Sequence, residues 1–349
     1  MPSGEVPMVA SNEVIDVDDS RETILDSAFS DQSSTTASLT SSIMKYTYEH
    51  GRRYHKYQEG RYLLPNDEKE QEHMDILAHL FRLVLGGRLF LAPIPADIRR
   101  VLDIGTGTGE WAIDMGELRP LQAECYWANE LADRYPDAKI IGNDLSPIQP
   151  GLVPPNVQFE VDDVENDWAH GAPFDYIHCR FMASSIRDWP RLFRRVLENL
   201  EPNGYAEFYD FDFFFRSDDN SLLPSHEMYV NCSETTRAAE KIGQTACPGP
   251  HLAGWARDAG FVNISEQKLK IPIGPWAKDP KMKEIGAWNQ LQAMEGMEGW
   301  SMALLTRIMG WSEEKVREHL VKLKRDYLDP KIHAYMTGYV VYGQRPKDK

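Results

Sequence analysis

The stretch Val101-Leu102-Asp103-Ile104-Gly105-Thr106-Gly107-Thr108-Gly109 joins a short apolar run to a glycine-rich turn. A strand that leads through such a turn into a helix is typical of a parallel α/β sheet, whose ligands bind at the carboxyl ends of the strands. Glycines tolerate positive φ and let backbone N–H groups approach a ligand without a Cβ in the way. The stretch therefore predicts the first strand of such a sheet and one wall of a ligand site.

The spacing of the glycines separates two kinds of ligand. A dinucleotide-binding turn reads G-x-G-x-x-G, and its third glycine is needed for close packing of the helix. Here Glu110 occupies that third position, and the glycines read G-x-G-x-G after Asp103. NAD is therefore disfavoured. The pattern instead resembles the first motif of class I methyltransferases, whose acidic residue helps to hold the methionine end of S-adenosylmethionine (SAM).

Acidic residues also follow the next two expected strands. Asp144 stands where a carboxylate can accept hydrogen bonds from both ribose hydroxyls, although an aspartate there could equally initiate a turn. In Asp162-Asp163-Val164, a carboxylate can accept from the adenine amino group while the apolar neighbour packs on the ring. Successive parallel strands bring these positions to one crevice. The residues expected to contact SAM are Asp103, Gly105, Thr106, Gly107, Gly109, Asp144, Leu145, Asp162, Asp163 and Val164.

Beyond Arg100, short apolar runs alternate with helical patterns. The expected strands are 101–104, 139–142, 157–161, 176–178, 205–211, 261–273 and 335–342. The expected helices are 66–85, 188–200, 225–242, 252–260, 281–292 and 312–325. Together they predict an α/β fold with a doubly wound, mostly parallel, seven-stranded sheet of the class I methyltransferase type. Added helices are expected to form a cap on the acceptor side.

The chain divides into four expected parts. Residues 1–44 form an acidic, Ser/Thr-rich tail expected to be disordered, because residues 1–42 contain eight acidic residues and one basic residue, Arg21. Residues 45–98 form an N-terminal segment and helix. Its basic, tyrosine-rich start is either a lid over a ligand pocket or a solvated surface segment. Residues 99–215 form the SAM-binding core, and residues 216–349 supply the cap helices and the C-terminal strands that complete the sheet.

Composition narrows the partners and the compartment. The 349 residues carry 54 acidic and 38 basic side chains, for a net charge of −16, which argues against direct nucleic-acid binding. Cys125, Cys179, Cys232 and Cys247 lack metal-ligand spacing, so no metal site is expected, and so few cysteines favour a reducing compartment. Without an apolar run long enough to cross a bilayer, we expect no membrane partner. A cytoplasmic location is expected, with a nuclear one left open.

Several segments carry a closer resemblance. Gly51-Arg52-Arg53-Tyr54-His55, residues 62–68, residues 144–150 and His333-Ala334-Tyr335 resemble the fungal LaeA-like methyltransferases, and the likeness runs from about residue 46 to residue 346. The resemblance implies a SAM-binding domain and a place in secondary metabolism. The family includes both regulators of gene clusters and tailoring enzymes.

Two features depart from the family pattern. The chain has Pro202-Asn203-Gly204 where the family usually has two glycines, a substitution that asparagine tolerates because it accepts left-handed geometry. Asp103 and Asp144 lie 41 positions apart, about twice the roughly 20 expected between a glycine turn and its ribose carboxylate. The excess falls in residues 116–130, which are either a surface insertion or a retained intron translated in frame. A true insertion would distort the first helix and weaken cofactor binding.

Methyl transfer from a sulfonium is an in-line displacement, so the protein must mainly align the acceptor and exclude water. If a base takes part, His178 and Tyr209 are the weak candidates, although for His178 a structural role is favoured first and a contact with the cofactor or acceptor second. Other polar residues near the expected strand ends are Arg180, Glu207, Asp210 and His251.

The segments 217–244 and 271–327 exceed what the sheet needs and are the expected source of an acceptor pocket. Their aromatic and sulfur-containing residues either line such a pocket or form ordinary core. They are Trp276, Trp288, Trp300, Trp311, Met294, Met297 and Met302. The leading hypothesis is a methyltransferase for a small molecule of fungal secondary metabolism. A regulatory methyltransferase with a protein partner in a nuclear complex, and a SAM-binding protein without turnover, remain as alternatives.

Overall fold

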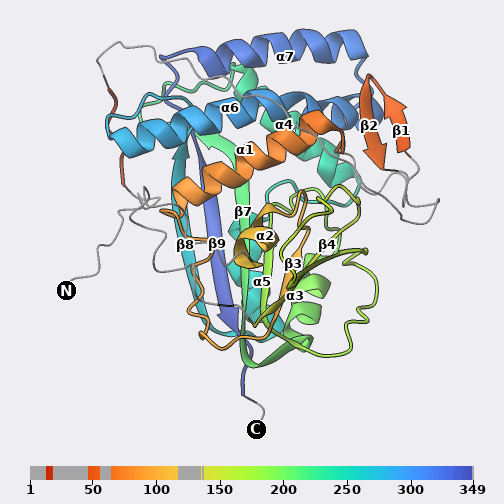
Figure 1. The fold of residues 1–349 in the computed structure, drawn as a ribbon. Helices are drawn as coiled ribbons and strands as arrows, with labels where there is room; N and C mark the ends of the chain where they lie inside the picture. Colours follow the sequence, from red (N-terminus) through yellow and green to blue (C-terminus); the bar gives the residue numbers. More distant parts are fainter. Residues whose placement is uncertain (1–12, 19–45, 56–63, 117–134, 136, 348–349) are drawn as a thin grey trace.

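Seven strands form one mixed sheet in the part of the chain that the computed structural model describes, residues 13–18, 46–55, 64–116, 135 and 137–347 (Figure 1). They are β3 (Arg100–Ile104), β4 (Lys139–Asp144), β5 (Val157–Val161), β6 (Phe174–Arg180), β7 (Leu200–Arg216), β8 (Val262–Pro272) and β9 (Tyr335–Gln344). Their order is β5-β4-β3-β6-β7-β9-β8. Only β9 runs antiparallel to its neighbours among these strands. The predicted doubly wound, mostly parallel sheet is confirmed.

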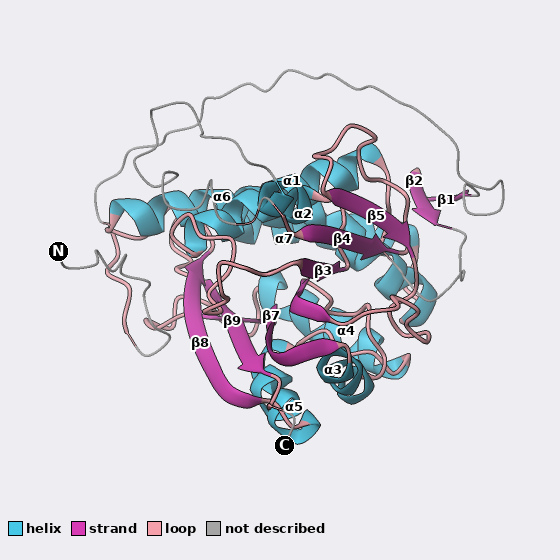
Figure 2. Cartoon of the chain, turned by 60° about the horizontal axis from the view of Figure 1, so that its bottom comes forward, coloured by secondary structure: helices cyan, strands magenta, loops and turns pink. Residues whose placement is uncertain are grey.

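Helices cover both faces of the sheet and its upper end (Figures 1 and 2). They are α1 (Glu68–Val84), α2 (Glu110–Gly116), α3 (Trp189–Glu198), α4 (Glu227–Lys241), α5 (Leu252–Ala259), α6 (Pro280–Ala303) and α7 (Glu313–Leu328). Trp111 of α2 packs on one face with Tyr176, whereas Phe193 of α3 and Leu252 of α5 pack on the other. Helices α1, α6 and α7 lie across the top of the sheet as the predicted cap.

The predicted helix starts rest on side-chain caps. Asp67 accepts a hydrogen bond from the backbone N–H of Glu70 at 3.0 Å and begins α1, and Asp188 does the same for α3 through Arg191 at 2.9 Å. These caps satisfy backbone donors that a helix leaves unpaired at its start.

None of the helices within the described ranges is long and apolar enough to cross a membrane.

The main differences from the predicted elements are extensions. β7 begins at Leu200 and includes Asn203, whose φ of 66° is the left-handed geometry expected of that residue. α6 passes its predicted end at residue 292 and continues to Ala303. A hairpin of β1 (Tyr46–Glu49) and β2 (Arg52–His55) forms part of the predicted N-terminal segment.

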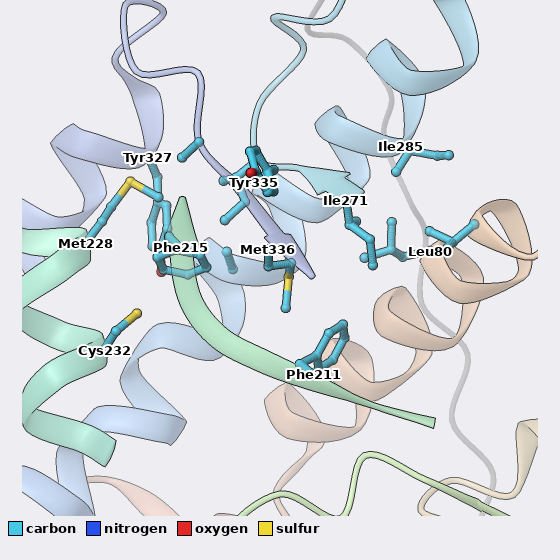
Figure 3. Close-up of a cluster of buried hydrophobic side chains, with 14 of the residues drawn as sticks. Leu80, Phe211, Phe215, Met228, Cys232, Ile271, Ile285, Tyr327, Tyr335 and Met336 are labelled. Atoms are coloured by element: carbon cyan, nitrogen blue, oxygen red, sulfur yellow. The ribbon is translucent and has the colours of Figure 1, made fainter. Parts of the chain in front are cut away.

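The cap and the last strands enclose the largest apolar cluster (Figure 3). Leu80 of α1 meets Phe211 and Phe215 of β7, Ile271 of β8 and Met336 of β9 in this cluster. Most of the aromatic and methionine residues expected in the acceptor region either belong to it or pack against it. These are Trp276, Met302, Trp288, Met294, Met297 and Trp311. For them the interpretation as ordinary core is confirmed.

Residues 13–18 bind the folded body. Ile15 is buried in the cap cluster, and Val17 forms a β-bridge with Ala277. The backbone N–H of Asp18 donates to the Trp276 carbonyl at 2.8 Å. The prediction of a disordered tail is therefore wrong for residues 13–18, because two alternating apolar side chains and backbone hydrogen bonds hold them in place. The remainder of residues 1–44 lies outside the described residues.

The placement of α6 depends on Gly286, where the helix approaches the loop after β8. A Cβ at Gly286 would lie 2.1 Å from the carbonyl oxygen of Gly274, which is backbone and cannot swing away. We expect Gly286→Ala to lower the free energy of unfolding by about 1–3 kcal/mol, as overpacked substitutions do. Thermal or denaturant unfolding measures the effect.

Gly254 of α5 is the matched control, because a Cβ there would meet nothing within 4 Å. Gly254→Ala should raise stability by roughly 0.5–1 kcal/mol through helix propensity alone. Equal stability of the two variants would show that the approach at Gly286 does not limit the fold.

Candidate active site

A cavity lies at the carboxyl ends of β3, β4, β5 and β6 and extends beneath α1, α4 and α6. The structure brings most of the expected cofactor residues onto its wall. These are Gly105, Thr106, Gly107, Asp144, Leu145, Asp162, Asp163 and Val164. Asp103 and Gly109 are not on the wall. A Cβ at Gly109 would lie 2.4 Å from the Phe159 ring, so that glycine allows the start of α2 to pack on β5.

Asp103 lies behind the glycine-rich turn and is 1% exposed. One carboxylate oxygen accepts a hydrogen bond from the Thr106 hydroxyl at 2.6 Å, and the other accepts from Nδ1 of His178 at 2.8 Å. Both oxygens therefore have protein partners. The geometry gives Asp103 the task of holding the turn, and direct contact with the methionine end of SAM stays a prediction.

Asp144 ends β4 and faces the cavity. Its Oδ2 accepts from the Gly107 N–H at 2.9 Å and its Oδ1 from the Ser146 N–H at 2.9 Å, so the carboxylate joins the turn to its own strand. Each oxygen keeps a second lone pair, which a ribose hydroxyl can use. Burial, with a smaller contribution from the nearby Asp103 carboxylate, raises the pKa of Asp144 to about 6.

The neighbouring polar groups also suit a nucleoside. Nδ2 of Asn143 is buried beside the cavity and has no hydrogen-bond partner within the described chain. After β5, Asp162 and Asp163 turn the backbone through hydrogen bonds from the N–H groups of Asp163 and Glu165, at 2.8 and 2.9 Å. Val164 offers an apolar surface next to them. The residues present therefore fit SAM, with donors, acceptors and a glycine cradle at one crevice.

Neither His178 nor Tyr209 lies on the cavity wall. The His178 ring stacks on Trp111 with centroids 3.9 Å apart, its Nδ1 is bonded to Asp103, and burial lowers its pKa. The Tyr209 hydroxyl is buried without a hydrogen-bond partner among the described residues, and its ring packs on Phe81. In this arrangement His178 supports Asp103, and Tyr209 belongs to the core.

Among the other polar residues considered near the strand ends, Arg180 and Asp210 line the cavity. Asp210 accepts from the backbone N–H groups of Met182 and Phe211, both at 2.9 Å, and burial raises its pKa to about 7. Glu207 is not on the wall, because its carboxylate binds the backbone N–H groups of residues 91 and 92. His251 is not on the wall either.

The far half of the cavity is mostly apolar and aromatic. Its walls include residues of α1, β7, α4, α6, α7 and β9, and Figure 3 shows Phe215, Tyr327 and Met336 from this region. The apolar lining residues include Met74, Leu77, Phe211, Phe213, Phe215, Trp300, Leu304, Tyr327 and Met336. Trp300 thus differs from the other expected tryptophans, which are not on this wall. The geometry provides a water-poor compartment next to the cofactor end.

A chain of polar side chains crosses the wall between α1 and α6. Asn289 donates from Nδ2 to the Pro272 carbonyl at 2.7 Å. Its side-chain oxygen Oδ1 accepts from Nε2 of Gln292 at 2.6 Å. A carbonyl oxygen only accepts, so both amides are oriented, and Oε1 of Gln292 faces Nε2 of His73 at 3.3 Å. His73 therefore donates from Nε2.

The other nitrogen of His73 is also engaged. Its Nδ1 lies 3.0 Å from Oε1 of Glu70, whose second oxygen accepts from Arg52 at 3.0 Å. His73 is therefore not free to take a proton from a substrate in this arrangement. Sequence reasoning missed Glu70 and His73, although buried polar residues three apart on one face of a helix are a signal that could have found them.

The N-terminal segment covers one side of the cavity. Asn66 lines the wall and donates to the Ser146 hydroxyl at 3.3 Å, next to Asp144. Arg53 of the hairpin holds Asn66 through hydrogen bonds to its carbonyl at 2.6 Å and to its side-chain oxygen at 3.2 Å. These contacts place residues 64–66 over the cavity beside Asp144, while residues 56–63 lie outside the described chain.

The segment 116–130 lies outside the described residues except for Gly116. α2 is nevertheless formed up to that point, with Trp111, Ala112 and Met115 buried. The expected distortion of this helix is therefore not seen in its described part. Whether the segment is an insertion or a retained intron stays open.

Metal-binding and disulfide features can be judged for the described residues. They contain no group of three His, Cys, Asp or Glu side chains that could hold a metal ion. Cys179, Cys232 and Cys247 are free thiols. Cys125 lies outside this part of the chain.

Comparison with known proteins identifies the family. A family model described as a methyltransferase domain matches residues 76–266. The methyltransferase pytC of Aspergillus terreus is 41% identical over 93% of this chain and 96% of its own length. The secondary metabolism regulator LAE1 of Cochliobolus heterostrophus is 33% identical, over 86% of this chain and 94% of its own. The protein-methionine methyltransferase laeA of Emericella nidulans is also 33% identical, over 85% of this chain and 76% of its own length.

Among solved structures, a phosphoethanolamine N-methyltransferase of Haemonchus contortus in complex with SAM aligns with a TM-score of 0.40 and 17% identity. The alignment covers 82% of this chain and 55% of that longer one. The sequence relatives, which match nearly the whole chain, carry the assignment. The chain belongs to the class I SAM-dependent methyltransferases, as a relative of fungal pytC and of the LaeA proteins.

Proposed function

We propose that the protein methylates an apolar, aromatic small molecule of fungal secondary metabolism. The observation that carries the proposal is the single cavity with two unlike halves. One half presents carboxylates and a glycine turn, and the other presents aromatic and aliphatic side chains. Small-molecule pockets are typically apolar, with a few placed polar groups. The higher identity to the methyltransferase pytC than to the LaeA regulators supports this reading.

In the proposed arrangement Asp144 accepts from the ribose hydroxyls, and Asp162, Asp163 and Val164 surround the adenine. The methionine end then lies over Gly105 and Gly107, where Asp103 acts indirectly by holding the turn. SAM supplies the methyl group as the electrophilic carbon of a sulfonium. The protein aligns the acceptor in the apolar half and excludes water from it. The cover made by residues 64–66 contributes to that exclusion.

Calorimetry with SAM, followed by transfer of labelled methyl groups into a cell extract, tests this function. We expect binding heat and label in the solvent-extractable small-molecule fraction. Label found only in protein would contradict the proposal and favour the regulatory methyltransferase. Binding without transfer in producing extracts would favour a SAM-binding protein without turnover.

Acidification should weaken SAM binding. The raised pKa of Asp144 means that its carboxylate is charged above about pH 6 and protonated below it. The charged form accepts from the ribose hydroxyls, so the dissociation constant should rise by up to about tenfold per pH unit below 6. Calorimetry at pH 7.5 and 5.5 measures this. Asp144→Asn should bind weakly at both values, and equal wild-type affinity at both would refute the role.

Trp300 and Trp288 offer a matched pair on α6, because Trp300 lines the cavity and Trp288 packs on the cap cluster instead. Trp300→Ala should lower methyl transfer into the extract by about tenfold or more, since burying a large apolar side chain contributes roughly 1.5–3 kcal/mol. The affinity for SAM should stay unchanged. Trp288→Ala should retain transfer, and equal losses in two folded variants would contradict the acceptor assignment.

A further inference from the structure

Arg180 is the last residue of β6 and lies beside the glycine-rich turn. Its neighbour Cys179 pairs with Ile104 of β3, so Arg180 is level with Gly105 at the point where the strand order reverses. Ligands of doubly wound sheets bind at this point. Arg180 is among the residues that line the cavity, as is Gly105.

The guanidinium of Arg180 makes no hydrogen bond and no ion pair with the described residues. Its guanidinium carbon lies over the face of Phe181, 5.5 Å from the ring centroid. The arginines of the N-terminal segment behave differently, since Arg52 and Arg53 each pair with a carboxylate. Arg180 is partly buried, and this burial lowers the pKa of its guanidinium. The N–H donors of the charged Arg180 guanidinium are therefore available to a ligand in the cavity.

The charges on the cavity wall are otherwise negative. Glu70, Asp144, Asp162, Asp163 and Asp210 line the cavity, and Arg180 is its one Lys or Arg within the described chain. SAM carries positive charge on its sulfonium and α-ammonium groups and negative charge on its α-carboxylate. With the nucleoside over β4 and β5, the methionine end reaches the edge between β3 and β6, where Arg180 lies.

A second unpaired group stands nearby. Oε2 of Glu110, the first residue of α2, is buried and has no hydrogen-bond partner among the described residues. Burial raises the pKa of Glu110 to about 7, and the charge of Arg180 is the strongest opposing influence. Glu110 therefore lies near enough to Arg180 to sense its charge but does not occupy its donors.

We propose that Arg180 anchors the α-carboxylate of SAM and so sets the position of the methionine end, an inference that rests on the proposed placement of the cofactor. Arginine presents two parallel N–H donors that match a carboxylate, and such charge-assisted pairs are among the stronger hydrogen bonds. Arg180 is a binding and positioning residue. It takes no part in the methyl transfer itself.

Decarboxylated SAM, which differs from SAM by the α-carboxylate alone, tests the anchor by calorimetry. The wild-type protein should bind SAM roughly ten- to a hundredfold more tightly than decarboxylated SAM. Arg180→Gln should bind SAM about as weakly as it binds decarboxylated SAM. Arg180→Lys should recover part of the preference, because it keeps the charge and loses the fork.

Arg195→Gln is the control, because Arg195 pairs with Asp167 and does not line the cavity. It should keep the full preference for SAM. The inference is overturned if Arg180→Gln, with a wild-type melting temperature, weakens both ligands equally, or if the wild type does not discriminate between them. No binding of either ligand by the wild type would instead overturn the cofactor site as a whole, and the anchor with it.

Discussion

The half-buried carboxylate of Asp144 is the junction on which the arrangement of the cavity depends. Taking a carboxylate out of water is costly, and its raised pKa expresses that cost. The N–H groups of Gly107 and Ser146 offset it. One of these donors belongs to the glycine turn after β3 and the other to the loop after β4. The need to satisfy one charge therefore holds two strand ends together. Asn66 connects residues 64–66, which cover the cavity, to these strand ends through its hydrogen bond to Ser146.

The acceptor half depends on a second constraint, the close approach of α1 and α6. A Cβ at Gly296 would lie 2.6 Å from Nε2 of His73, and one at Gly299 would lie 2.7 Å from Oε2 of Glu70. The close approach of α1 to α6 therefore requires glycine at these two positions of α6. The resulting chain of hydrogen bonds ends on the carbonyl of Pro272, so the cavity wall is tied to the end of β8. Both the close packing of the two helices and the hydrogen bonds between their buried polar groups thus fix the position of the apolar compartment.

Local sequence was sufficient for the sheet and for most of the cavity wall at the carboxyl ends of its strands, because strands, turns and caps are set by neighbouring residues. The run ending at Ile104, the cap at Asp188 and the left-handed Asn203 are examples. The acceptor end depends on contacts between distant segments. Glycine has a low helix propensity, so Gly296 and Gly299 look unfavourable within a helix. The reason for them is the close packing of α1 against α6 at these positions. The sequence places His178 near the end of a strand, but that its ring faces Trp111 becomes clear only when α2 is in place.

The anchoring of Ile15 changes how the N-terminal region is connected. Residues 13–18 bind the loop after β8, and the hairpin beginning at Tyr46 is fastened to α1 through Arg52 and Asp67. The intervening residues are therefore tethered at both ends, and a single proteolytic cut among them would leave both pieces attached to the body. Truncation at residue 18 would differ in kind from truncation at residue 12, because it would also expose the apolar site that Ile15 fills.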